Sequence, residues 1–155
     1  MEGPAAMTAQ GQGLPDLLYS DAERALADSL SSLLADRGGV DKTLARTESV
    51  ETYDDALWHA VAAELGCAGL LIPERDGGAG ASYREAASVA EALGAAVAPV
   101  PFLGSSVVAT AALLSVAATA PVHAASDLIR RMADGGVTTA LATPFATPPG
   151  RAFPV

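Results

Sequence analysis

This 155-residue sequence is poor in cysteine, in basic residues and in aromatic residues. Its single cysteine, Cys67, excludes an intramolecular disulfide framework, so a reducing, cytoplasmic location is expected. Nine basic residues against 18 acidic ones give a net charge of −9, and a nucleic acid would need a basic stripe that this chain lacks. Aromatic residues make up only 5% of the chain, which favours closely packed small-residue helices over an aromatic-rich sheet.

The sequence also predicts neither a metal site nor a membrane span. The two histidines, His59 and His123, lie far apart in the chain, and no second cysteine is available as a ligand. The longest uncharged interval covers residues 92–126, which is long enough to suggest a span. Its serine, threonine, glycine and alanine content, without flanking basic clusters, instead predicts a buried helix of a bundle.

Recurring apolar residues predict an all-α, up-and-down bundle of about five helices. The expected helices lie within residues 20–37, 54–65, 83–97, 105–118 and 122–133. Ser20 with Glu23, and Ser82 with Glu85, have the spacing of a capping box at a helix start. Residues 41–51 carry mixed charges without an apolar period and are interpreted as a polar loop.

The fourth expected helix has no polar face and is predicted to lie at the centre of the assembled protein, with Ser105 as its N-cap. Residues 137–143 then alternate β-branched and small side chains, which predicts one short strand. A lone strand has nothing to pair with, so it would begin a β-domain missing from these 155 residues. The expected organisation is a flexible tail at 1–19, a helical domain at 20–136 and a truncated, proline-rich β-domain start at 137–155.

A glycine-rich turn separates the second and third expected helices. It follows Pro73 and contains Gly77, Gly78 and Gly80. Tyr83 stands where the dinucleotide-binding pattern needs a glycine, and no Gly-Lys-Ser/Thr follows for a P-loop. The turn is therefore interpreted as structural rather than as a phosphate cradle.

The stretch ALWHAVAAELGCAGLLIPERDGGAG, followed by a helix with EALG, resembles the N-terminal helical domain of the acyl-CoA dehydrogenases. The family pattern is Glu-Leu-Gly, then Gly-Leu, then Ile-Pro-Glu, two variable residues and Gly-Gly-x-Gly. It is matched by Glu64, Leu65, Gly66, Gly69, Leu70, Ile72, Pro73, Glu74, Gly77, Gly78 and Gly80. Arg75 and Asp76 depart mildly from the family at the variable positions. The resemblance covers residues 20 to about 142.

This resemblance implies FAD-dependent α,β-desaturation of an acyl-CoA thioester, the chemistry of fatty-acid β-oxidation. In the family a glutamate of the C-terminal helical domain removes the α-proton, and the flavin accepts the β-hydride. That glutamate has no match here, and neither do the family's Thr-Glu-Pro and Gly-Ser-Asp, since this chain has Ala142, Thr143, Pro144 and Phe145 where the family's strand continues with those motifs. The resemblance therefore implies no catalytic residue in this chain and inactivity of the chain alone. The missing domains or a partner subunit, in a homo- or hetero-oligomer, would supply FAD and the base.

The family's acyl pocket also implies candidate substrate-binding residues. By position, its far wall falls on Phe102, Leu103, Ser105 and Ser106. The same side chains could equally be ordinary core and helix-cap residues, because a pocket wall and a core face use the same apolar side chains. For the whole chain, the alternative is a non-catalytic helical subunit or a protein-interaction module.

Overall fold

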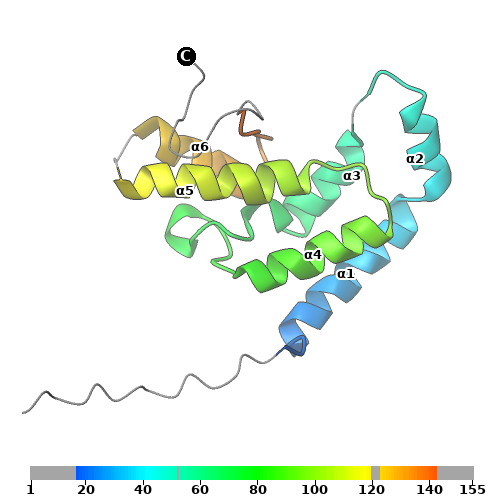
Figure 1. Cartoon of the computed structure of the whole chain (residues 1–155), viewed down its shortest axis with the longest axis horizontal. Coiled ribbons are helices and arrows are strands. Elements are labelled where there is room, and N and C mark those ends of the chain that lie inside the picture. Colours follow the sequence, from blue (N-terminus) through cyan, green and yellow to red (C-terminus); the bar gives the residue numbers. More distant parts are fainter. Residues whose placement is uncertain (1–16, 52, 120–122, 143–155) are drawn as a thin grey trace, which may run out of the picture.

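The computed structural model describes residues 17–51, 53–119 and 123–142, which form a helical domain (Figure 1). Its α-helices are α1 (Asp21–Arg37), α2 (Val40–Thr47), α3 (Asp55–His59), α4 (Tyr83–Ala95), α5 (Thr110–Thr119) and α6 (His123–Ala133). Two π-helical segments extend them: η1 (Ala60–Glu64) continues α3, and η4 (Leu103–Ala109) leads into α5. Two 3₁₀ turns, η2 (Cys67–Gly69) and η3 (Glu74–Asp76), lie between η1 and α4. The predicted all-α class is confirmed, because the described residues contain no strand.

Helices α1 and α4 lie side by side and run in the same direction (Figure 1). Near their starts, the Arg84 guanidinium Nε donates to the Glu23 carboxylate at 2.7 Å. Near their ends, Leu34 and Ala96 line one shallow groove. Both helices begin with the predicted capping box, in which the serine hydroxyl and the glutamate carboxylate accept from backbone N–H groups of the first turn.

Two hydrophobic clusters make up the core. The larger one joins α1, α3, η1, α4 and the start of η4, and its central side chains are Leu30, Trp58, Val61, Val89 and Phe102. The smaller cluster lies between α5, α6 and the chain before η3, and it consists of Ile72, Ala109, Ile129, Met132 and Ala133. The apolar periods of α1, α3 and α6 thus predict most of the buried face, because these helices bury one stripe each.

Helix α2 was not predicted, and the interpretation of residues 41–51 as a loop is wrong for most of its length. The helix buries none of its residues, so no apolar period marked it in the sequence. Hydrogen bonds hold it instead: Lys42 Nζ donates to the Arg37 carbonyl at 2.8 Å, and Thr43 Oγ1 donates to the Val97 carbonyl at 3.3 Å. An element held this way is among the first to open locally.

The fourth predicted helix differs from expectation at its start and in its environment. It begins at Phe102, three residues early, so Ser105 is not its N-cap. Within this chain the helix is not enclosed, because Leu103, Val108 and Val116 keep 62%, 43% and 48% of their surfaces exposed. No helix among the described residues has the length and apolar character needed to cross a bilayer.

The predicted strand is absent from residues 137–142, and Thr143 lies outside the described residues. Residues 137–142, here called the exit segment, instead lie against the helices. Trp58 Nε1 donates to Thr138 Oγ1 at 2.8 Å, and the Thr139 N–H donates to Ser105 Oγ at 3.1 Å. A strand needs a partner for its backbone groups, and here side chains of the bundle take part of that role.

Candidate functional site

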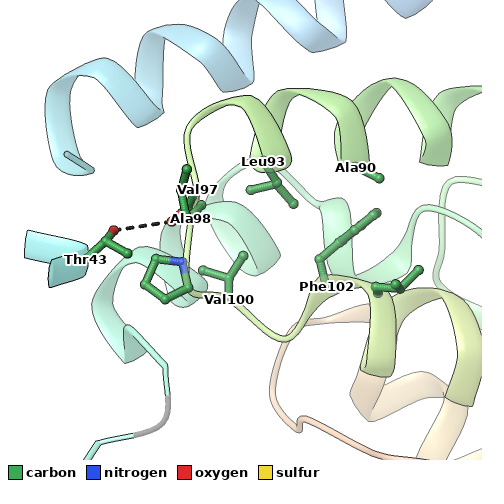
Figure 2. Close-up of a pocket in the computed structure, with 10 residues that line it drawn as sticks. Thr43, Ala90, Leu93, Val97, Ala98, Val100 and Phe102 are labelled. Atoms are coloured by element: carbon green, nitrogen blue, oxygen red, sulfur yellow. Dashed lines mark hydrogen bonds between the residues drawn. The ribbon is translucent and has the colours of Figure 1, made fainter. Parts of the chain in front are cut away.

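The described residues form an open apolar pocket of about 410 Å³ between α4, the link after it, the start of η4 and one residue of α2. This volume lies within the roughly 300–1,000 Å³ typical of small-molecule sites. Its lining residues are Thr43, Ala90, Leu93, Gly94, Val97, Ala98, Pro99, Val100, Phe102 and Leu103. Figure 2 shows the Phe102 ring pointing toward α4 beside Ala90, with Leu93 and Val100 nearby.

The sequence builds this pocket through one helix and one extended link. In α4, Ala90, Leu93 and Gly94 have the spacing i, i+3 and i+4 and share a face, and Val97 follows just beyond the end of the helix. Pro99 and Pro101 then prevent a continuous helix, so the chain crosses in front of that face before η4 begins. The link is anchored where the Asp54 N–H donates to the Pro99 carbonyl at 2.8 Å.

The pocket can bind but cannot transfer protons. Thr43 carries the one polar side chain among its ten lining residues, and no lining residue has a titratable group. Thr43 Oγ1 donates to the Val97 carbonyl across the pocket mouth (Figure 2). An apolar ligand would gain burial here, but a reaction needing a general base would have to find it elsewhere.

The four predicted substrate-binding residues divide into two pairs. Phe102 and Leu103 line the pocket, with Phe102 buried and Leu103 exposed at its rim. Ser105 and Ser106 are each only 2% exposed and are not among the lining residues. The Ser105 hydroxyl accepts from the Thr139 N–H, while Ser106 Oγ has no hydrogen-bond partner among the described residues. The substrate-binding role of these residues stays a prediction.

Of the ten lining residues, the sequence predicted only Phe102 and Leu103 as site residues. It missed the other eight: Thr43, Ala90, Leu93, Gly94, Val97, Ala98, Pro99 and Val100. Thr43 was placed in a loop, so its approach to the pocket had no signal in the sequence. Gly94 lies inside α4, and Val97, just beyond the helix, is 61% exposed. The signal that could have found Leu93 and Gly94 is the face of α4 that they share with Ala90.

Outside the pocket, the titratable side chains Glu23 and Cys67 have shifted pKa values because of contacts that belong to the fold. Hydrogen bonds from Arg84, and from the Ser20 backbone, lower the pKa of Glu23 to about 2. Burial raises the pKa of the Cys67 thiol to about 11, so this cysteine is an inert core side chain. No group of three or more histidine, cysteine, aspartate or glutamate side chains in the described part of the chain could hold a metal ion.

Comparison with known proteins identifies related sequences. The family model described as "Acyl-CoA dehydrogenase, N-terminal domain" matches residues 20–135. The protein named acyl-CoA dehydrogenase IpdE2 from Mycolicibacterium smegmatis is 38% identical over 104 residues, which are 67% of this chain and 33% of the relative. Its namesake from Mycobacterium tuberculosis is 39% identical over 92 residues, 59% of this chain and 29% of the relative. The chain thus spans about a third of the curated relatives it matches. No solved structure matches it.

Proposed function

Since this chain belongs to the acyl-CoA dehydrogenase family through its N-terminal helical domain, we propose that it forms one wall of the acyl site of an FAD-dependent dehydrogenase. The reaction is the α,β-desaturation of an acyl-CoA thioester. The observation that carries this proposal is the apolar pocket at Phe102 and Leu103, the first two positions to which the family resemblance assigns substrate contact.

The role of this chain in that reaction is binding and the exclusion of water. Val97, Val100 and Leu103 offer apolar surface to a hydrocarbon tail, and each Å² of apolar surface removed from water contributes about 25 cal/mol. The charged CoA end finds no cationic side chain among the lining residues, so the tail, rather than the nucleotide, occupies this pocket. A tail held in this way limits where the thioester carbons can lie.

The described residues do not fit a flavin. The pocket at Phe102 has no basic side chain among its lining residues for a pyrophosphate, and it offers the Thr43 hydroxyl as its one polar side chain for a ring system. We therefore derive no catalytic step through FAD in this chain. The flavin and the α-proton base belong, in this proposal, to further domains or to a partner subunit, and the described residues alone are inactive. The cytoplasm is the compartment we propose, because the sole cysteine is a buried, free thiol.

A second candidate function, that of a non-catalytic subunit or interaction module, is favoured by one observation. Residues 103–119 carry no charge, yet Val108 and Val116 of this stretch are exposed. Such a surface suits contact with another protein domain. The two candidates differ in whether the pocket binds an acyl group.

The test is binding of octanoyl-CoA to the purified chain, measured by isothermal titration calorimetry. Leu103→Asp places a charge at the pocket rim and should weaken binding at least roughly tenfold, because the acyl tail would have to desolvate it. Val108→Asp is the matched control, since Val108 is an exposed residue of the same π-helical segment that does not line the pocket. Equal affinities of the two variants would contradict the proposed acyl site.

The visible spectrum of the same preparation tests where the flavin belongs. We expect no absorption band near about 450 nm, where oxidised flavin absorbs, because the described residues offer no site for the cofactor. A stoichiometric yellow flavin on the purified chain would contradict this part of the proposal. Octanoyl-CoA binding without flavin would support the division of roles described above.

A further inference from the structure

Just beyond the end of helix α4, a valine stands at the position where helices with this type of ending usually carry glycine. The Ala98 N–H donates to the Leu93 carbonyl at 2.9 Å, and the Val97 N–H donates to the Gly94 carbonyl at 3.0 Å. These two bonds define a Schellman ending whose left-handed residue is Val97, with φ of 48°. Val97 is the one non-glycine residue with positive φ among the described residues. A β-branched side chain is among the least suited to this conformation.

The same helix carries a glycine where neither its backbone nor its packing requires one. Gly94 lies within α4 and does not have positive φ. A Cβ added at Gly94 would meet nothing within 4 Å, so no neighbouring atom excludes a side chain. Glycine inside a helix is nevertheless unfavourable relative to alanine. The fold would thus be served better by a side chain at 94 and a glycine at 97.

Both exceptions line the same pocket. Local rules of folding fail most often at functional sites, where a binding requirement outweighs the local preference. We propose that Gly94 and Val97 are specificity-determining residues of the pocket, with Gly94 leaving width for a broad acyl tail and Val97 forming the adjoining wall. The inference rests on the proposed function, since it takes the acyl group of a CoA thioester as the ligand.

Thr43 supports this arrangement from α2. Its Oγ1 donates to the Val97 carbonyl at 3.3 Å, so the strained residue is held from the opposite side of the pocket mouth (Figure 2). Leu93, one residue before Gly94, is buried in the main core and fixes the rotation of α4. The gap at Gly94 and the wall at Val97 therefore keep their positions relative to Phe102.

The experiment compares two ligands, straight-chain octanoyl-CoA and ring-containing phenylacetyl-CoA, by calorimetry with the full chain. Gly94→Leu should weaken phenylacetyl-CoA binding by roughly tenfold or more and octanoyl-CoA binding by less, because the added side chain narrows the pocket. Gly104→Leu is the matched control: Gly104 is also helical, has equally open space for a Cβ, and is not a lining residue. An unchanged ligand preference in Gly94→Leu, or the same change in Gly104→Leu, would overturn the proposal.

Thermal unfolding separates a binding role from a structural one. Gly94→Ala should raise Tm by about 2–4 °C because alanine favours the helix, and Val97→Gly should not lower Tm because glycine suits the left-handed residue. Val97→Gly should still weaken octanoyl-CoA binding, since the wall is lost. A large fall in Tm for both variants would show that these residues serve the fold, which contradicts the proposal.

A third ligand distinguishes failure of this inference from failure of the proposed function. If the unmodified chain binds neither acyl-CoA, the proposed function fails, and the variants are compared with the apolar dye 1-anilinonaphthalene-8-sulfonate. Loss of dye binding in Gly94→Leu but not in Gly104→Leu would support the width-setting role for apolar ligands. Equal dye binding in all three proteins, or no dye binding to the unmodified chain, would overturn it.

Discussion

Glu23 shows how much one residue's environment depends on distant partners. Its spacing from Ser20 identifies it as a capping residue, which the structure confirms. The structure adds that Glu23 is only 2% exposed and that Arg84 donates to both of its carboxylate oxygens, at 2.7 and 3.2 Å. A buried carboxylate is tolerated only when it is paired and hydrogen-bonded, so this pair ties the starts of α1 and α4 together.

We predict that Glu23 makes the chain acid-sensitive. Its pKa is lowered in the folded state to about 2 from an ordinary 4.5. The stabilisation is therefore complete above about pH 4.5 and is lost as the pH falls through about 2. Glu23→Gln should lower the free energy of unfolding at pH 7 and reduce its dependence on pH between 4.5 and 2, as measured by urea denaturation at several pH values.

Glu64→Gln is the control for this measurement. Glu64 pairs with Arg37 at 2.9 Å, but both side chains are about half exposed, and exposed pairs contribute little. A loss of stability in Glu64→Gln as large as that in Glu23→Gln would contradict the assigned importance of the buried pair.

A second prediction concerns the hydrogen bond between Trp58 and Thr138. Thr138→Val removes the acceptor of the buried indole N–H and should cost about 1–3 kcal/mol of unfolding free energy. The emission of Trp58, which is the only tryptophan, should change as well. Thr119→Val is the control, because among the described residues Thr119 Oγ1 bonds only carbonyls of its own helix, and Thr119 is exposed. Unchanged stability and emission in Thr138→Val would show that the exit segment is not held by this bond.

At the scale of elements, the turn between η2 and α4 depends on close backbone approach. Gly78 lies so near the chain at Ile72 that an added Cβ would come within 2.1 Å of the Ile72 carbonyl oxygen and 2.5 Å of that of Gly69. The surrounding backbone uses its own donors, since Gly80 bonds the Ile72 carbonyl at 2.8 Å and Ala81 the Leu70 carbonyl at 2.9 Å. These bonds position the start of α4 against the core.

Gly78→Ala should therefore lower the free energy of unfolding by about 1–3 kcal/mol, the usual cost of overpacking. Urea denaturation followed by circular dichroism measures the change. Gly104→Ala is the control, because a Cβ at Gly104 meets nothing within 4 Å and should leave the chain as stable or slightly more stable. Equal stability of the two variants would contradict the conclusion that the turn needs the close approach of Gly78 to the backbone at Ile72.

At the scale of the whole molecule, the outer surface of η4, α5 and the exit segment carries exposed apolar side chains. Val108, Ala112 and Val116 follow one another at four-residue spacing, and Leu141 lies beside Val116 in a second apolar pocket of about 210 Å³. We call these four residues the α5 face. Contiguous apolar patches above a few hundred Å² are rare on monomers and mark contact surfaces.

We expect the isolated chain to self-associate through the α5 face, because that contact would remove apolar surface from water. Val116→Lys should shift the chain toward monomer in sedimentation velocity experiments at high concentration. Val50→Lys is the control: Val50 is exposed but lies in the loop after α2. A chain that is monomeric at every concentration without substitution would contradict this prediction.

The sequence by itself determined what depends on neighbours along the chain. Both capping boxes and the helical class follow from local spacing and are confirmed. The family also follows from local motifs, and the match of the family model to residues 20–135 confirms it. Such features survive in the sequence because each is encoded within about two helical turns.

Only the tertiary structure decided which distant residues meet. Glu23 finds Arg84 across 61 positions, Trp58 finds Thr138 across 80, and Thr43 of an unpredicted helix reaches Val97. The pocket exists for the same reason, because α4, the proline link and η4 form its walls only after they pack. Contacts between residues far apart leave no period or spacing in a single sequence, since packing rather than local preference selects them.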